Sequence, residues 1–252
     1  MSKMKIFLIV LLSFFTLIIS AKDYKASIFG VKSDGVTLNT RSIQKAVDYI
    51  NENGGGQLVL YVGRYLTGTI QLKSNVTIRL EKGAVLVGTT SVYDYVVVNG
   101  TKAIISADNQ ENIGIIGTGV IEGQGAAVID NINVQIQKGY LKDKVSQVSP
   151  LLIYMNGCKN VTVEQINLWN APAGALSYNG CKDVTISKVS IKSNNVANSK
   201  GIMLSGCDGV SLTNIYFDTS GAELSSFLPS KNVTIVNCSN SKGKKTEIRN
   251  FK

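Results

Sequence analysis

The chain has 252 residues and a formal net charge of +9 at pH 7, and its 24 glycines and 3 prolines suit short strands joined by tight corners rather than a helical bundle. It contains no histidine and no CxxC pair, which excludes the common zinc sites, so we expect no metal ion and no cofactor. A basic protein suits an acidic polysaccharide, a membrane surface or a nucleic acid as partner. The lysines are scattered and form no nucleic-acid-binding motif, so we expect no nucleic acid partner.

Residues 1–21 differ in kind from the rest of the chain. Lys3 and Lys5 precede a mainly apolar run over residues 6–19, and the small residues Ser20 and Ala21 follow it. This order is typical of a secretory signal peptide, and the run is too short for a comfortable membrane span. An uncleaved membrane anchor is the alternative. We therefore expect a secreted or periplasmic protein with no membrane partner once the signal has been removed.

The segment that follows predicts a short strand and then a single helix. We expect the strand over residues 26–29 and a helix that begins at Thr40, as its N-cap, and ends at the Asn53-Gly54 pair. The apolar residues of this segment fall on one helical face, namely Ile43, Ala46, Val47 and Ile50. Such a helix covers the open end of a solenoid, where unpaired strand edges would otherwise promote aggregation.

Residues 150–238 repeat a corner motif: a polar residue, then Asn, Asp or Gly, then Val, then Ser or Thr, then an aliphatic residue. Its Val161, Val184, Val210 and Val233 stand 23, 26 and 23 residues apart. A period of this length, with β-branched runs and Asn or Gly corners, is typical of a solenoid whose coils bury their apolar face only by stacking. We predict an all-β, right-handed parallel β-helix as one domain over residues 22–238, followed by a polar tail over residues 239–252.

Three cysteines occupy the same position on successive coils. Cys158, Cys181 and Cys207 each end an apolar run just before a corner, and we expect them to stack at the spacing of neighbouring strands, about 4.8 Å. That distance allows a disulfide, but three cysteines in a row cannot all pair. We expect a buried ladder of free thiols that pack as small hydrophobic side chains. A disulfide between two of them is the alternative.

Three features of the later coils bear on a binding site. Between residues 126 and 149 the repeat is interrupted by a polar, partly helical excursion, and long loops on a solenoid are often functional. Alternation along the strands directs Tyr154 and Met203 outward and Tyr178 inward. Trp169 either stacks on a sugar ring or packs at a corner.

Several short motifs occur in an order that marks a known family. They are Asp34-Gly35, Asn39-Thr40, Ile43-Gln44-Lys45-Ala46, Gly54-Gly55-Gly56, Gly63, Tyr65-Leu66-Thr67-Gly68, Leu72-Lys73-Ser74-Asn75-Val76, Gly83-Ala84 and Asp94-Tyr95, and later Ile115-Ile116-Gly117-Thr118-Gly119, Gly123-Gln124-Gly125 and Asn170-Ala171-Pro172. By the number and order of these motifs, residues 29–238 resemble the polygalacturonase-like enzymes of glycoside hydrolase family 28. The resemblance implies a right-handed parallel β-helix that hydrolyses pectin-type polymers of galacturonic acid.

The resemblance also implies an inverting glycosidase, which needs two carboxyl functions about 6.5–9.5 Å apart. In the family they come from an Asn-Thr-Asp segment on one coil and an Asp-Asp pair on the next, assisted by a Gly-His-Gly and a later Arg-Ile-Lys. In this chain Lys200 stands at the first carboxylate position, and Gly221 and Ala222 stand at the other two. The chain has no histidine, and no Arg-Ile-Lys precedes Lys252. We therefore expect a truncated and catalytically impaired member of the family.

Lys200 suits a different role, because an ammonium in a groove holds a uronate carboxylate as a point charge. An ordinary surface lysine is the alternative. Asp218 and Glu223 are the candidates for a displaced catalytic dyad, although a shift of one residue along a strand sends a side chain to the opposite face. Three functions stay open: an impaired exported member that still binds pectin or oligogalacturonate, an active glycosidase with displaced carboxylates or with coils from another chain, and a structural β-helix without ligand.

The C-terminal end of the repeat carries a further expectation. A solenoid that stops in mid-array exposes its last coil unless something covers it. After Cys238 the sequence is polar, with only Ile248 and Phe251 apolar. We expect a frayed tail and self-association through the open C-terminal coil.

Overall fold

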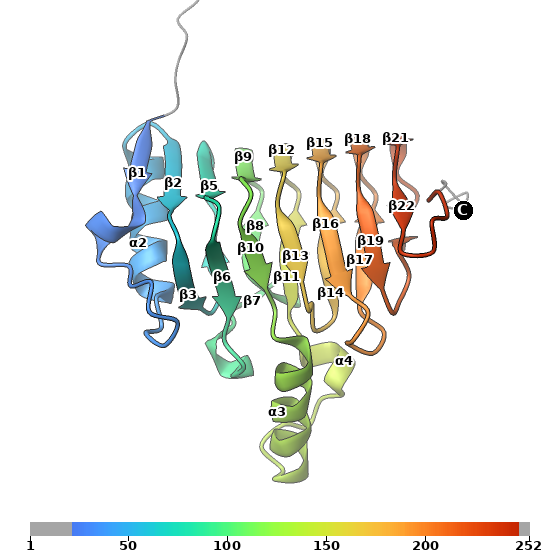
Figure 1. Ribbon diagram of the computed structural model, residues 1–252, viewed down its shortest axis with the longest axis horizontal. Coiled ribbons are helices and arrows are strands. Elements are labelled where there is room, and N and C mark those ends of the chain that lie inside the picture. Colours follow the sequence, from blue (N-terminus) through green and yellow to red (C-terminus); the bar gives the residue numbers. More distant parts are fainter. Residues whose placement is uncertain (1–21, 247–252) are drawn as a thin grey trace, which may run out of the picture.

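The computed structural model describes residues 22–246, which form a right-handed parallel β-helix with three parallel sheets (Figure 1). The predicted fold class is therefore confirmed. The expected signal peptide, residues 1–21, and residues 247–252 of the expected tail lie outside the described residues. None of the helices within residues 22–246 has the length and apolar character that a bilayer span requires.

Each typical coil contributes one strand to each of the sheets, here named A, B and C. Sheet A contains β1 (Asp23–Lys25), β2 (Gly56–Leu60), β5 (Val76–Leu80), β9 (Glu111–Ile116), β12 (Lys159–Glu164), β15 (Lys182–Ser187), β18 (Asp208–Thr213) and β21 (Lys231–Val236). Sheet B contains β3 (Gly63–Thr67), β6 (Ala84–Gly88), β10 (Val120–Glu122), β13 (Asn167–Trp169), β16 (Ser190–Ser193), β19 (Tyr216–Thr219) and β22 (Ser239–Asn240). Sheet C contains β4 (Ile70–Gln71), β8 (Thr101–Asp108), β11 (Leu151–Asn156), β14 (Gly174–Asn179), β17 (Lys200–Ser205) and β20 (Leu224–Ser226), with β7 (Val97–Val98) antiparallel to β8.

The corner motif lies at the start of the sheet A strands, as its spacing predicts. Val161 pairs with Val184, which pairs with Val210, and Val210 pairs with Val233. The residue before each of these valines has a positive φ, between 52° and 71° at positions 160, 183, 209 and 232. Asn, Asp and Gly tolerate this left-handed backbone best, which explains why they recur there.

The interior of the coils is a continuous apolar core. Tyr178 is fully buried and lies in the core with Met155 and Leu204, so its predicted inward direction is confirmed. Cys158, Cys181 and Cys207 are also buried in this core, and all of them are free thiols. Hydrogen bonding to Cys158 and Cys207, followed by burial, raises the pKa of the Cys181 thiol well above its ordinary value. The same hydrogen bonds with Cys181 lower the pKa of the Cys158 thiol and lower that of the Cys207 thiol to about 6. The buried side chains of the ladder pack as small hydrophobic groups, and Cys181 at its centre is a neutral thiol.

The N-terminal end of the core is covered by α2 (Thr40–Glu52), whose buried residues are the four predicted from the apolar face. Asn39, not Thr40, is the N-cap, because the Thr40 hydroxyl instead accepts a hydrogen bond from the N–H of Gly68 at 2.7 Å. The strand expected over residues 26–29 is a 3₁₀ turn, η1 (Ala26–Phe29), and the strand β1 precedes it. Gly30 follows η1 in the left-handed region, with φ of 78°, and reverses the chain.

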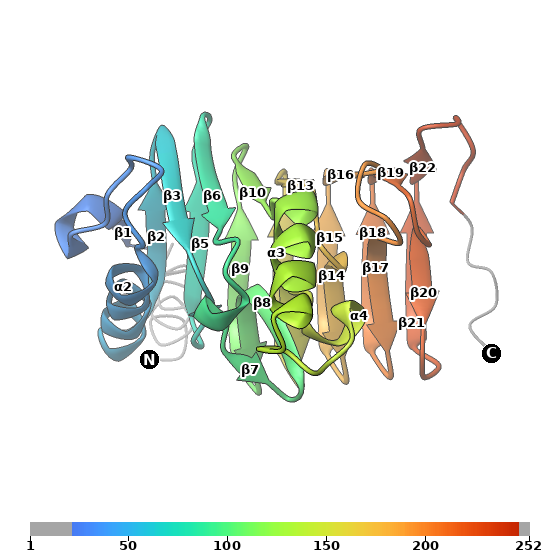
Figure 2. The same ribbon diagram turned by 90° about the horizontal axis from the view of Figure 1, so that it is seen from below.

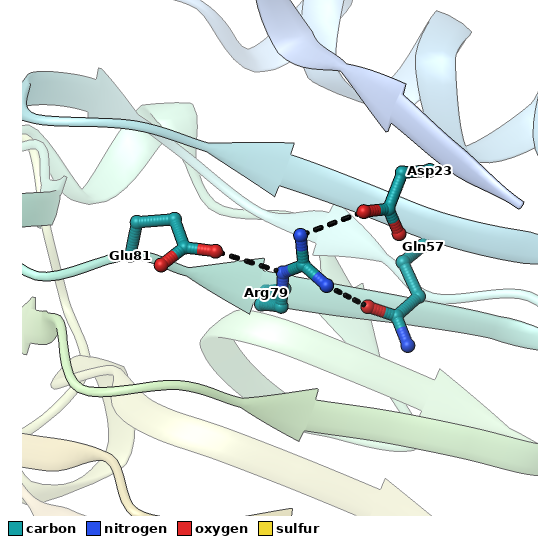
Figure 3. Close-up of polar contacts among 4 residues, drawn as sticks. All are labelled: Asp23, Gln57, Arg79 and Glu81. Atoms are coloured by element: carbon teal, nitrogen blue, oxygen red, sulfur yellow. Dashed lines mark hydrogen bonds and ion pairs between the residues drawn. The ribbon is translucent and has the colours of Figure 1, made fainter. Parts of the chain in front are cut away.

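Arg79 of β5 links the edge strand β1 to the neighbouring strands of sheet A (Figure 3). Its Nη2 lies 2.7 Å from Oδ2 of Asp23, and its Nε lies 3.0 Å from Oε1 of Glu81. Its Nη1 donates to Oε1 of Gln57 at 2.9 Å. These side chains are partly exposed, so each ion pair contributes at most about 1 kcal/mol. Their main effect is to hold three neighbouring strands in one register.

The excursion between residues 126 and 149 contains two helices, α3 (Gly125–Gln137) and α4 (Val145–Val148). Its predicted partly helical character is thus confirmed. The helix α3 projects away from the coils in Figure 1 and crosses in front of the middle strands in Figure 2. It is anchored by a small apolar cluster that joins it to α4 and to η2 (Val92–Asp94), formed by Val92, Val128, Ile132 and Val148.

The last described coil is less well covered than the others. Val233 and Ile235 of β21 are half-buried, whereas Val210 and Leu212 of the preceding coil are buried. Strand β22 pairs with β19, so the β-helix continues past the expected boundary at Cys238. Residues 239–246 are held by hydrogen bonds, such as the one from Lys244 N–H to Oδ1 of Asn240 at 3.0 Å, and so differ from the frayed segment that we expected.

Candidate binding groove

A groove with a volume of about 760 Å³ lies on the outer face of sheet C, beside the α3–α4 excursion. One wall consists of residues 100–102, at the turn of the β7–β8 hairpin. The other consists of Ile129 of α3 with residues 145–147 of α4 and Ser149, which follows α4. Leu151, Ser177 and Met203 belong to the strands below. The excursion and the hairpin thus turn an otherwise flat sheet face into a concave site.

The floor of the groove is apolar. Leu151 and Met203 line it, and beneath them Tyr154 is buried in a cluster with Ala103 and Leu151, against which Met203 packs from β17. Both Tyr154 and Met203 pair in register with Ser177, so they lie on the outer face on either side of it, as predicted. Burial raises the pKa of the Tyr154 hydroxyl, which therefore stays neutral. This floor offers contact area to the C–H groups of a ligand rather than charge.

Lys200 lines the groove at the start of β17. Its side chain is exposed, and the ion pairs within residues 22–246 involve only Arg79 and Lys188 as cations, so its ammonium has no carboxylate partner there. The backbone at this point is fixed, because the buried Ser199 hydroxyl donates to the carbonyl of Ala171 at 2.8 Å. The structure therefore places the predicted substrate-binding lysine in a concave site.

Lys102 is a second lysine of the groove, and it belongs to no sequence motif that would reveal it. Its Nζ donates to the carbonyl of Val92 at 2.8 Å, and burial lowers its pKa while nearby Asp143 acts in the opposite direction. Lys102 reaches the groove only because the β7–β8 hairpin folds against η2 and the excursion. Its ammonium is tied to the protein, so Lys200 is the more available charge.

No Asp or Glu is among the described residues that line the groove. Asp218 belongs to β19 of sheet B, and its two carboxylate oxygens accept hydrogen bonds from Nδ2 of Asn194 at 3.1 and 3.0 Å. Glu223 lies just before β20 of sheet C, and its carboxylate accepts from Nδ2 of Asn240 at 2.6 Å and from the hydroxyl of Thr246 at 2.8 Å. The carboxylates of the two candidates for a displaced dyad thus accept hydrogen bonds from different residues on different coils.

The two other positions that match the family's carboxylates lie in a tight strand-like segment. The N–H of Gly221 donates to the carbonyl of Ser199 at 2.9 Å, and the N–H of Gly201 donates to the carbonyl of Ala222 at 2.9 Å. A Cβ built on Gly221 would lie only 2.9 Å from the carbonyl oxygens of Asn198 and Ser199. Any side chain at position 221 therefore requires the backbone to shift.

Trp169 ends β13 on the outer face of sheet B and is 36% exposed. Its neighbours in register are Glu122 and Lys192. It does not line the groove of sheet C. This placement is compatible with both expected roles of Trp169, stacking on a sugar ring and packing at a corner.

The model of the glycosyl hydrolases family 28 matches residues 56–246. An exo-poly-α-D-galacturonosidase of Dickeya chrysanthemi is 24% identical over 239 residues, which cover 76% of this chain and 39% of that protein. An endo-polygalacturonase of Pectobacterium carotovorum subsp. carotovorum is 30% identical over 191 residues, covering 68% of this chain and 46% of that protein. The chain thus spans less than half the length of these two curated relatives.

Among solved structures, a candidate glycosyl hydrolase from Parabacteroides merdae ATCC 43184 is similar to this chain. It is 52% identical, with a TM-score of 0.85, and the match covers 88% of this chain and 100% of that one. The similarity therefore extends over nearly all of the coils described above.

Proposed function

Because the chain belongs to family 28 of the glycosyl hydrolases, we propose that it is an exported polygalacturonase-like protein that binds pectin-type acidic polysaccharide in the groove of sheet C and hydrolyses it little or not at all. The observation that supports this proposal is the charge of the groove. Lys200 lines it with a free ammonium, and no carboxylate from residues 22–246 lines it.

Loss of hydrolysis is argued from the missing acid and base. An inverting glycosidase needs one carboxylic acid to protonate the leaving oxygen and one carboxylate to activate water. Each contributes roughly 10²- to 10⁴-fold in rate, so the loss of both lowers turnover by about 10⁴-fold or more. The positions that match the family's carboxylates hold Lys200, Gly221 and Ala222. At Gly221 the carbonyls of Asn198 and Ser199 leave no room for a replacement side chain.

Retention of binding is argued from Lys200 and the apolar floor. An ammonium and a carboxylate about 4 Å apart attract each other by about 1 kcal/mol in bulk water and by up to about 4 kcal/mol near a protein surface. The lysine is exposed, so the lower figure is the better guide. Leu151 and Met203 add apolar contact area, which contributes roughly 25 cal/mol per Å² removed from water. We expect weak binding that falls as the salt concentration rises.

Calorimetry with an oligogalacturonate tests the binding proposal. The wild-type protein should release or take up heat on titration, and Lys200→Ala should weaken the affinity about fivefold to tenfold, which corresponds to roughly 1–1.4 kcal/mol. Lys182→Ala is the matched control, because Lys182 is an exposed lysine on sheet A, away from the groove. An absence of heat with the wild type would leave a structural β-helix without ligand as the better description.

Asp218 and Glu223 define the alternative of an active glycosidase. Reducing-end release from polygalacturonate that is abolished by Asp218→Asn or Glu223→Gln would establish a displaced dyad. The described contacts favour a simpler role for Glu223, because its carboxylate joins Asn240 and Thr246 to the last coil. On that basis Glu223→Gln should loosen residues 240–246 rather than change a reaction rate.

Export is the remaining part of the proposal, and it rests on the charged and apolar pattern of residues 1–21. Cells that express the full chain should yield a secreted or periplasmic protein whose N-terminus lies near residue 22. Recovery of the whole protein in the membrane fraction with residues 1–21 still attached would show an anchor instead.

A further inference from the structure

A second cavity, of about 390 Å³, lies on the outer face of sheet C nearer the N-terminal end. Residues 97–99 of the β7–β8 hairpin line this cavity, whereas residues 100–102 of the same hairpin line the groove, so the hairpin contributes a different side to each. The other residues that matter here are Gln71 and Lys73, at β4 and just after it, and Ser106 and Asp108 of β8. None of these residues belongs to the groove that carries the proposed function.

Ser106 gives the first sign that the cavity is built for a ligand. Its side chain is 1% exposed, and its hydroxyl has no hydrogen-bond partner among the described residues. A buried hydroxyl without a partner is destabilising, so native proteins rarely retain one without a reason. Gln71 pairs with Ser106 in register. The backbone N–H and carbonyl of Gln71 bind Gln44, but its side-chain amide makes no hydrogen bond within residues 22–246.

The charged residues of the cavity are Lys73 and Asp108, and they do not form an ion pair with each other. Asp108 is held in place because its Oδ1 accepts from Nδ2 of Asn156 at 2.7 Å, of Asn99 at 2.8 Å and of Asn109 at 3.2 Å. Its Oδ2 accepts no hydrogen bond within the described part of the chain. The half-buried Lys73 forms no ion pair there either. The cavity therefore presents one free cation and one fixed carboxylate oxygen that is ready to accept hydrogen bonds.

We propose that this cavity binds a single sugar acid, or another small polyhydroxylated carboxylate, independently of the groove. Lys73 binds the carboxylate of the ligand, and Oδ2 of Asp108 and the hydroxyl of Ser106 bind its hydroxyl groups. Val97 packs against a C–H face of the ligand. A simple anion without hydroxyl groups would leave Ser106 unpaired and would be repelled by Asp108. A neutral sugar would leave Lys73 without a partner. The size lies within the usual range for small-ligand pockets.

Nuclear magnetic resonance of the methyl groups of the intact protein separates the two sites. The methyl signals of Val97 report on this cavity, and the methyl signal of Met203 reports on the groove. Sodium D-galacturonate should shift the Val97 signals in a saturable manner, whereas D-galactose and sodium acetate should bind at least tenfold more weakly. Lys73→Gln should weaken the effect of galacturonate about tenfold or more, since a hydrogen bond to a charged group is lost.

Ser106→Ala supplies a second signature. It should weaken galacturonate binding several-fold and raise the thermal unfolding midpoint of the unliganded protein, because it removes a buried hydroxyl that has no partner. Lys200→Ala is the matched control and should leave the Val97 titration unchanged. It should affect only the Met203 signal, so the failure of one site is distinguishable from the failure of the other.

Four results would overturn the proposal. The first is an absence of Val97 shifts with galacturonate. The second is an unchanged titration in both Lys73→Gln and Ser106→Ala. The third is equal affinity for galacturonate and for either galactose or acetate. The fourth is a Val97 response that disappears in Lys200→Ala, which would locate all binding in the groove.

Discussion

Lys200 of β17 pairs in register with Gly174 of β14, so the position beside the lysine on the neighbouring strand has no side chain. A Cβ built on Gly174 would lie 3.0 Å from Cε of Met203, 3.3 Å from the carbonyl oxygen of Lys200 and 3.4 Å from Cδ2 of Leu151. Gly174 therefore keeps the floor of the groove open at the place where its available cation lies.

Gly174→Ala should weaken oligogalacturonate binding about threefold or more, because the added methyl group occupies the floor beside Lys200. The backbone of Gly174 is not in the left-handed region, and the flexible end of Met203 has only to move slightly. The free energy of unfolding should therefore change by less than about 1 kcal/mol. Calorimetry and thermal unfolding measure the two effects.

Gly114→Ala is the matched control for this substitution. Gly114 lies within β9 of sheet A, where the nearest atoms to a built Cβ belong to the Thr77 side chain, at 2.7–3.4 Å. Gly114→Ala should leave ligand affinity unchanged. If Gly174→Ala bound oligogalacturonate as well as the wild type does, the ligand would not lie on this part of the floor.

The hydrogen bonds of the Asp34 carboxylate lead us to expect that the protein loses stability at low pH. The hydroxyl of Thr37 donates to its carboxylate at 2.6 Å, as do the N–H groups of Thr37 at 2.8 Å and Val36 at 3.0 Å. These bonds lower the pKa of Asp34 to about 2. Because the folded pKa is below the unfolded value of about 3.9, the stabilisation is fully present above that value and is lost as the pH falls through about 2.

The measurement is the thermal unfolding midpoint of the wild type and of Asp34→Ala between pH 7 and pH 2. The difference between the two proteins should be constant from pH 7 to about pH 5 and should shrink as the pH falls toward 2. A difference that stays constant down to pH 2 would show that the carboxylate of Asp34 does not stabilise the turn.

Burial of the thiol ladder should protect its cysteines from thiol reagents. Cys158, Cys181, Cys207 and Cys238 are each at most 2% exposed. A thiol reagent such as Ellman's reagent should therefore react with none of them in the native protein, and with all four after unfolding in guanidinium chloride without reductant. Detection of only two reactive thiols after unfolding would establish a disulfide, which is the alternative that the coil spacing leaves open.

We expect two copies of the chain to associate through the last described coil. Val233 and Ile235 are half-buried, Phe227 is 90% exposed, and strand β21 has no described neighbour beyond it. An open strand edge is a template for pairing with another edge, and a second copy of the chain presents the same edge. Sedimentation velocity should show a dimer whose fraction rises with protein concentration.

Phe227→Ser should reduce that dimer, and Tyr140→Ser is its control, because Tyr140 is 71% exposed on the excursion, away from the last coil. A single monomeric species at all concentrations would contradict the proposal. Equal dimerisation by both variants would place the contact elsewhere.

The parts of the fold that the sequence predicts are those that depend on local backbone preference and on period. Asn160 and Asn232 lie at left-handed corners because few other residues tolerate that backbone, and Val161 and Val184 stack because the period repeats. The N-cap of α2 was predicted one residue too late. The buried Asn39 binds the N–H and carbonyl of Lys32 in the preceding loop, a tertiary contact that helix propensity does not contain.

The groove was less predictable. Lys200 was found from a motif position, but the wall that makes it part of a concave site comes from α3, α4 and the β7–β8 hairpin, and no repeat describes them. Lys102 was missed for that reason. Asp218 and Glu223 stand only five residues apart in the sequence. Yet the Asp218 carboxylate accepts a hydrogen bond from Asn194, and the Glu223 carboxylate accepts one from Asn240. Sequence spacing alone does not show which neighbour a side chain holds.

The rate of reducing-end release from polygalacturonate, measured with the purified protein at high enzyme concentration, shows whether the chain hydrolyses the polymer. With Lys200, Gly221 and Ala222 at the matching positions, the rate should not exceed that of a heat-inactivated control by more than a trace, and Glu223→Gln should leave it unchanged. Release at the rate of an ordinary hydrolase, abolished by Asp218→Asn and also by Glu223→Gln, would contradict this expectation, because it would show that both carboxyl groups act on the glycosidic bond.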